Sequence, residues 1–218
     1  MNAEWPTARL QMEDQSRPRG YRNRSTKMFR KLFGMTSKVP SQLRADLVTD
    51  SGMLCVWDAK PFAAITDYDS WEKELCEDED IMRHLQSGHL VPINLGDGVY
   101  TVELRQGSAD SMSQREREYL LVPSQPYLLN STGRILISGL EHVGADPRTF
   151  LECELPPGSY TVQVQLIDWT EEPGSKDSNG RPTSNALPDI IVFVQPSEMG
   201  AFDYRQSLEI FRKEDALR

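Results

Sequence analysis

The side chains best suited to bind a metal ion are two histidines and a cysteine that lie near one another in the sequence. His84 and His89 are five residues apart, and Cys76 precedes them. Zinc sites normally use closely spaced pairs such as Cys-x-x-Cys or His-Glu-x-x-His, and neither pattern occurs in the chain. The whole chain has three histidines. The sequence therefore predicts no metal site and no bound cofactor.

A catalytic nucleophile has no recognisable setting in this sequence. No Gly-x-Ser-x-Gly elbow occurs, and Gly96-Asp-Gly98 lacks the third glycine and the following helix of a dinucleotide-binding loop. Cys55 and Cys153 fall in strand-like runs, where cysteine is usually a small buried hydrophobe. Cys76 lies among carboxylates, whose negative charge disfavours the reactive thiolate. We expect no enzyme activity. A site built from dispersed carboxylates would leave no local motif and stays as an alternative; the candidates are Asp97, Glu103, Asp168 and Asp189.

Carboxylates are concentrated in a short segment with Lys73 as its only opposing charge. Its acidic residues are Asp67, Asp69, Glu72, Glu74, Glu77, Asp78, Glu79 and Asp80. A calcium-binding EF-hand needs an oxygen ligand at its fifth position and glycine at its sixth, where this segment has Trp71 and Glu72. Two interpretations are left, a solvated helix face and a patch that binds a basic protein, since clustered charge speeds association with cationic surfaces.

A long segment without apolar periodicity, Thr170–Leu187, separates two strongly strand-like runs. Connections of this length inside a compact domain are usually functional or disordered. We weigh a flexible hairpin tip against a loop that binds a partner. In the second interpretation Trp169, Glu171 and Glu172 at the base of the loop would contact that partner.

Charge divides the chain into two parts. Residues 1–44 carry a net charge of +7 and residues 45–218 carry −16. Such asymmetry is typical of a tail attached to a folded body. We expect 1–44 to be a basic, largely disordered tail and 45–218 to be a β-rich globular domain. That domain is either one unit or two sub-lobes, 45–110 and 111–218.

The basic tail contains one amphipathic stretch, Lys27–Gly34, with four apolar residues on one helical face. Three interpretations of the tail are open. Residues 9–38 bind nucleic acid or lipid, or the tail is a leader that packs only its apolar edge. In the third, Met28 is the native start and residues 1–27 are not native.

Short alternating runs predict that the body consists mainly of strands. Val99–Arg105 and Ser159–Trp169 alternate apolar and polar residues, as in half-buried antiparallel strands. Asp69–Gln86 instead has helical periodicity, with Trp71, Leu75, Met82 and Leu85 as its apolar stripe. Tyr204–Leu217 is expected to form a short C-terminal helix. The predicted fold class is mainly β (α+β), an antiparallel β-sandwich or jelly-roll-like domain with one acidic helix and a short C-terminal helix.

The composition also suggests where the protein works. No stretch approaches the roughly 18 apolar residues of a membrane span. Residues 1–10 lack the order of a secretory signal. Three cysteines without close pairing suit a reducing compartment. We expect a cytoplasmic protein.

Four segments in this order resemble small β-rich bacterial families of unknown function, including immunity-type proteins of polymorphic toxin systems. They are Asp50–Asp58, Asp67-Tyr-Asp-Ser-Trp71, Gly96-Asp-Gly-Val-Tyr100 and Leu155-Pro-Pro-Gly-Ser-Tyr160. The resemblance covers roughly residues 45–195 and transfers no active-site residue. It implies an intracellular binding protein of bacterial type.

Taken together, these features favour a non-catalytic cytoplasmic protein-binding module. Its expected role is that of an immunity protein, which neutralises a basic toxin by electrostatic and steric occlusion. The alternative is a carbohydrate- or small-ligand-binding β-sandwich module. That alternative needs an exposed aromatic platform, for which Trp57, Trp71 and Trp169 are the candidates.

Overall fold

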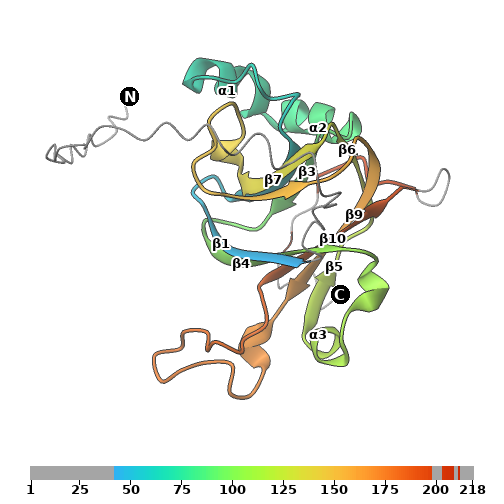
Figure 1. The fold of residues 1–218 in the computed structure, drawn as a ribbon. Helices are drawn as coiled ribbons and strands as arrows, with labels where there is room; N and C mark the ends of the chain where they lie inside the picture. The colour runs from blue at the N-terminus through green and yellow to red at the C-terminus, as the bar shows by residue number, and fades with distance from the viewer. Residues whose placement is uncertain (1–41, 198–202, 209–210, 212–218) are drawn as a thin grey trace, which may run out of the picture. The chain divides into compact units, whose positions relative to one another are not determined.

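Two β-sheets form the body of the protein in a computed structural model, which describes residues 42–197, 203–208 and 211 (Figure 1). Contacts divide the chain into units 1–38 and 39–218, and the first unit lies outside the described residues. The predictions for the basic tail therefore fall outside the description, except that residues 42–44 belong to the first strand.

The first sheet has six strands and the second has four, and the mainly β prediction is confirmed. In the first sheet the order is β1 (Gln42–Thr49), β4 (Gly98–Gln106), β10 (Ile190–Pro196), β9 (Gly158–Ile167) and β5 (Leu120–Pro123), with β6 (Tyr127–Ser131) also paired to β9. In the second the order is β3 (Leu90–Asn94), β2 (Met53–Asp58), β7 (Arg134–Gly139) and β8 (Phe150–Glu154). Neighbours are antiparallel except for β4 and β10, which run parallel. Each sheet takes strands from both sides of residue 110.

The sheets share one apolar core because the inward residues of both alternate along their strands. Leu47, Val102 and Val192 of the first sheet belong to the same buried cluster as Leu54 and Ile137 of the second. The outward faces are apolar as well. A second cluster lies outside β2, β3 and β7, and a third lies outside β9 and β10. Both outward faces therefore need a cover.

Helices and short 3₁₀ turns supply these covers. The second sheet is covered by α1 (Tyr68–Leu75) and α2 (Asp78–Gln86), and η3 (Leu140–His142) lies beside α1. On the first sheet, η2 (Ala109–Ser111), the residues flanking α3 (Gln114–Glu118) and η4 (Trp169–Glu171) contribute to the third cluster. Within the described part of the chain, no helix has the length and apolarity needed to cross a membrane.

The acidic segment forms two helices where one was predicted. α1 begins after Asp67, which accepts a hydrogen bond from the Ser70 amide, and Glu77 is extended between the helices. The buried residues explain the break, since Ile81 and Leu85 face the sheet together with Leu75. Six residues separate Leu75 from Ile81, which would place them about 120° apart on one continuous helix. The prediction that Met82 belongs to the buried apolar stripe was therefore wrong, because Ile81 is the buried residue.

The predicted C-terminal helix is absent from residues 204–208, which have no regular structure. Tyr204 instead bonds through its hydroxyl to Thr161 and Ser197. These contacts hold the segment against the sheet without a helical repeat. The remainder of that predicted helix, apart from Phe211, lies outside the described residues.

A buried ionic network joins β4 to α3. Arg105 donates to Glu103 and to Glu116, and its guanidinium lies 5.7 Å from the centre of the Phe193 ring. Burial by itself raises the pKa of Glu116. The hydrogen bonds from Arg105 and Ser113 outweigh burial and lower the pKa to about 2. The ionised carboxylate therefore stabilises the fold.

This network predicts an acid-dependent loss of stability that Glu116→Gln removes. The folded-state pKa lies below the ordinary value of 4.5, so the contribution is complete above about pH 5 and is lost as the pH falls toward 2. We expect the substitution to reduce the free energy of unfolding by about 2–3 kcal/mol at pH 7, and by less than half of this at about pH 3. Urea unfolding at both pH values measures the difference. Glu118→Gln, on the exposed side of the same helix, is the control, and a deficit independent of pH would contradict the assignment.

Candidate acidic binding surface

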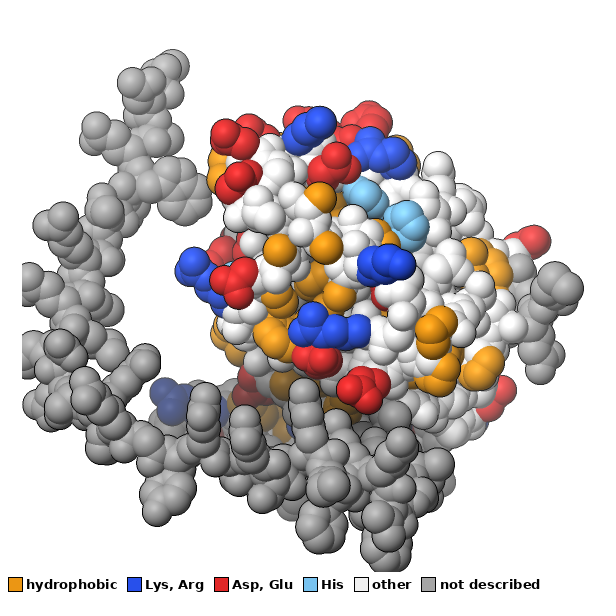
Figure 2. All heavy atoms as spheres, turned by 45° about the horizontal axis from the view of Figure 1, so that its top comes forward, with side chains coloured by type: hydrophobic (Ala, Val, Ile, Leu, Met, Phe, Trp, Pro, Cys, Tyr) orange, Lys and Arg blue, Asp and Glu red, His pale blue; other side chains and the backbone are white. Residues whose placement is uncertain are grey.

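The outer side of α1 and α2 carries the carboxylates that the sequence analysis singled out. Figure 2 shows acidic side chains gathered over the part of the molecule formed by these helices. Their inner sides are fixed on the second sheet by Leu75, Ile81 and Leu85. The apolar side therefore packs inward, and the acidic side faces solvent. We call this outer side the acidic layer.

Three of the eight acids cap a helix or form ion pairs, and a fourth, Glu72, accepts a hydrogen bond from the Tyr68 hydroxyl at 3.3 Å. Asp67 accepts hydrogen bonds from the amide and hydroxyl of Ser70, and these bonds lower the pKa of its carboxyl group. Arg83 pairs with Asp80 and, at 3.1 Å, with Glu74. These three carboxylates are therefore committed to the fold of the layer.

The other five acids are exposed, and no ion pair involves them among the described residues: Asp69, Glu72, Glu77, Asp78 and Glu79. The first turn of α2 tolerates Asp78 and Glu79 because the positive end of the helix dipole lies there. This arrangement stabilises the carboxylates without cancelling their field. The layer thus presents uncompensated negative charge to solvent.

An exposed aromatic ring lies beside these carboxylates. Tyr68 exposes 66% of its surface and stacks against Trp71, with ring centres 6.1 Å apart and planes at 25°. The Trp71 indole nitrogen donates to the carbonyl of Leu140 at 2.9 Å, which fixes the ring beneath Tyr68. The negative charge of Glu72 raises the pKa of the tyrosine, so the phenol keeps its proton at neutral pH. The sequence analysis missed Tyr68, whose position directly after the capping Asp67 was the available signal.

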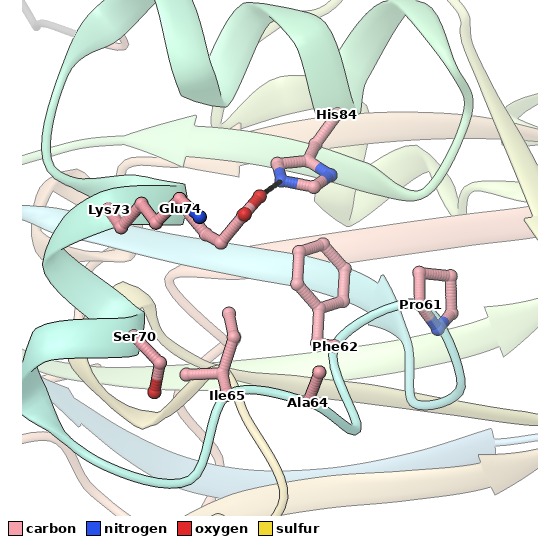
Figure 3. Close-up of a pocket in the computed structure, with 8 residues that line it drawn as sticks. All are labelled: Pro61, Phe62, Ala64, Ile65, Ser70, Lys73, Glu74 and His84. Carbon is pink, nitrogen blue, oxygen red and sulfur yellow. Dashed lines mark ion pairs between the residues drawn. The ribbon is translucent and has the colours of Figure 1, made fainter.

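A cavity of about 290 Å³ opens beside α1 (Figure 3). Its wall is partly apolar and partly polar, with Pro61, Phe62, Ala64, Ile65, Ser70, Lys73, Glu74 and His84 as lining residues. The Nε2 atom of His84 lies 3.5 Å from a Glu74 carboxylate oxygen, and its ring packs 4.7 Å from Phe62. Burial, with the charge of Arg83, lowers the pKa of His84 against the opposing effect of Glu74, so the imidazole is neutral at pH 7.

Among its lining residues, the cavity has no side chain placed to act as a catalytic nucleophile. The Ser70 hydroxyl is already bonded to Asp67. His84 approaches His89 with ring centres 6.1 Å apart, and Cys76 is exposed at the end of α1. Among the residues that the structure describes, no three His, Cys, Asp or Glu side chains are grouped to hold a metal ion.

The three tryptophans proposed as ligand platforms have structural roles. Trp57 is completely buried, packs edge-to-face on Phe62 and donates to Ser138, so its candidacy was wrong. Trp169 is partly buried in the third cluster, and its indole nitrogen donates to Asp189 at 2.7 Å. Trp71 is bonded and stacked as described above. Neither Trp57 nor Trp169 has the open aromatic face that a sugar needs.

The loop Thr170–Leu187 is ordered by its own hydrogen bonds. Lys176 and Pro182 form a β-bridge, and the Asp177 carboxylate accepts from two backbone amides at the tip. Glu172 is held by Arg115 of α3, whereas Glu171 is exposed. Figure 1 shows this loop extending from the end of the domain opposite α1 and α2. The structure therefore does not bring Trp169, Glu171 and Glu172 together with the acidic layer.

Most of the dispersed carboxylates are hydrogen-bonded within the described part of the fold. Asp189 accepts from the Thr101 amide as well as from Trp169, and Glu103 is buried against Arg105. Asp168 accepts from Thr170. None of these three, nor Asp97, lines either of the two described cavities. Three of the four carboxylates are thus bonded within the fold.

Comparison with known proteins yields likenesses in fold only. No family model matches the chain, and no curated protein sequence matches it. A structure described as crocagin biosynthetic gene J aligns with a TM-score of 0.49 and 17% identity, covering 72% of this chain and 97% of that one. ComJ from Bacillus subtilis, described as an inhibitor of the DNA-degrading activity of NucA, aligns with a TM-score of 0.44 and 11% identity, covering 73% and 98%. Both TM-scores are below 0.5, so neither alignment supports a statement about function.

The stacked pair predicts different structural roles for its two rings. We expect Tyr68→Ala to leave the free energy of unfolding within about 0.5 kcal/mol of the wild type, because the ring is exposed. Trp71→Ala loses packing and a hydrogen bond and costs about 2 kcal/mol. Urea denaturation of the two variants tests this difference. Equal destabilisation would mean that Tyr68 is part of the core and is not presented for binding.

Proposed function

We propose that the chain is a non-catalytic module that binds a basic partner protein on its acidic layer. The observation that carries this proposal is the exposed Tyr68 ring, which stacks on a fixed tryptophan and is flanked by exposed carboxylates. Tyrosine is enriched among the residues that dominate binding energy at protein interfaces. Among the described residues, Tyr68 is the aromatic one of the exposed large hydrophobic side chains, and its ring offers a partner an apolar face with a polar tip.

The charge of the layer defines the chemistry of the partner. Asp69, Glu72, Glu77, Asp78 and Glu79 present a single sign of charge, which attracts a surface rich in lysine and arginine. Electrostatic complementarity of this kind sets the rate and specificity of association more than its final strength. The aromatic ring supplies the contact that holds the complex. In this proposal the carboxylates speed the encounter with the partner, and the Tyr68 ring stabilises the complex once it has formed.

The mode of action that fits this surface is occlusion. α1 and α2 are fixed on the sheet, so they can cover a cationic surface without rearranging. A toxin that acts on nucleic acid uses such a surface to bind phosphates. An immunity protein working in the cytoplasm would neutralise it by occupying that surface. This role needs no catalytic group in the chain.

Removing charge from the layer should weaken binding more than removing the same charge elsewhere. The test uses the basic protein that co-purifies with the full chain from the cells that produce it, with the complex rebuilt from pure components. Asp69→Asn, Glu77→Gln and Glu79→Gln combined should raise the Kd roughly tenfold to hundredfold at low salt. The matched control combines Asp97→Asn, Glu118→Gln and Glu154→Gln, which neutralise three exposed acids outside the layer.

Calorimetry at several salt concentrations distinguishes the outcomes. The wild-type affinity should fall as salt rises, because exposed charges are screened beyond about 8 Å at physiological ionic strength. The variant of the layer should show a shallower salt dependence, and the control should follow the wild type. Equal effects of the two triple variants would refute a localised docking surface, and an affinity independent of salt would refute the electrostatic contribution.

A further inference from the structure

Strand β1 has one unpaired hydrogen-bonding edge in the described part of the protein. It pairs with β4 along its whole length, from Gln42 opposite Arg105 to Thr49 opposite Gly98. No other described strand joins it, and no backbone hydrogen bond outside the sheet involves residues 42–49 among the described residues. Such an edge presents amide and carbonyl groups that can pair with a further strand.

The two sides of β1 differ in chemistry. Leu43, Ala45 and Leu47 face the core, and only Leu47 is fully covered, while Leu43 and Ala45 are partly exposed. The inward apolar row is therefore incompletely covered at this edge. The outward side chains are all exposed and are Gln42, Arg44, Asp46 and Val48. Val48, opposite the exposed Val99 on β4, adds an apolar spot at one end.

The sequence of β1 complements itself when a second copy approaches antiparallel. With Ala45 at the two-fold axis, Arg44 lies opposite the partner subunit's Asp46, and symmetry forms this pair twice. Leu43 then lies opposite the partner subunit's Leu47, which completes the inward row. Opposite charges facing each other across antiparallel strands stabilise the pair, and like charges destabilise it. The arrangement satisfies both sides of the strand.

Neighbouring registers lack this complementarity. A shift by one residue places outward side chains opposite inward ones, which the pleat of a sheet forbids. Centring the axis on Arg44 or on Asp46 places two like charges opposite each other. The Arg44 side chain is 43% exposed and Asp46 is exposed, so both can reach a second strand. Arg44 now contacts the Ala186 carbonyl and pairs with Glu103 at 3.9 Å, and Asp46 accepts from the Thr101 hydroxyl. These contacts hold both side chains above the sheet, and a second strand would compete with them.

We propose that two copies of this chain associate through β1 in the Ala45-centred register, which joins their six-stranded sheets into one. A two-fold symmetric interface of this kind is the commonest route to a homodimer. The contact is one strand wide, so the association is weak and depends on concentration. The acidic layer lies on the other sheet, and this inference therefore stands or falls independently of the partner proposed above.

Charge reversal on β1 tests both the dimer and its register. Arg44→Asp and Asp46→Arg each place like charges opposite each other twice, so each variant should dimerise roughly tenfold to hundredfold more weakly than the wild type. In the mixed dimer formed by an equimolar mixture of the two variants, the two reversed residues face each other with opposite charges, and so do the two native residues. The mixture should recover wild-type dimerisation, as should the double variant R44D/D46R. Sedimentation velocity of the full chain over a range of concentrations measures all five samples.

The mixture also controls for folding, because both of its components still carry their substitutions. Recovery in the mixture excludes unfolding as the cause of the loss. A wild type that stays monomeric at about 0.3 mM, a concentration at which weak dimers of this affinity are populated, would overturn the proposal. Single variants that dimerise like the wild type, or a mixture that stays monomeric, would overturn the register and the proposal with it.

Discussion

The need to bury both faces of the four-stranded sheet governs the rest of the structure. Every residue of β2 is buried, so its inward side chains pack on the first sheet and its outward ones require a second cover. The helices α1 and α2 provide that cover through Leu75 and Ile81, while Leu85 packs into the core between the sheets. Because the apolar side of both helices packs inward, the exposed acids of the segment lie on the outer side, whereas Glu74 lines the cavity. The position of the acidic layer is thus a consequence of how the core is closed.

The same constraint explains how the carboxylates are divided. Those nearest the helix contacts are neutralised locally, as Glu74 and Asp80 are by Arg83, or cap a helix, as Asp67 does. Those on the outer rim have no such neighbours among the described residues. Unpaired charge of one sign reduces stability through repulsion, and the helix dipole offsets only part of it. The proposed binding of a basic partner would offset this repulsion.

The sequence was informative where one periodicity dominated. Alternation in Val99–Arg105 and Ser159–Trp169 predicted strands, and the mainly β class followed from it. The expectation that these strands are only half-buried was wrong, because Glu103, Thr161 and Gln165 on their polar faces are buried. The break between α1 and α2 was not predicted, because the sequence fits two patterns equally well. With Met82 in the apolar stripe the segment forms one continuous helix, and with Ile81 it forms two helices. The prediction for Trp57 was wrong because a tryptophan in a predicted strand gives the same sequence pattern whether one face of the sheet is buried or both. The exposure of Tyr68 depends on how α1 packs, and the open edge of β1 depends on the order of the strands. Neither can be predicted from the local sequence pattern.

The most direct test of the central claim is the footprint of the basic partner on this chain by amide hydrogen exchange. The account predicts that complex formation slows exchange in α1 and at the start of α2, with little change in the loop Thr170–Leu187. Exchange in β2 should stay slow in both states, because that strand is buried without the partner. Protection confined to the Thr170–Leu187 loop, with α1 and α2 unchanged, would contradict the assignment of the acidic layer as the docking surface.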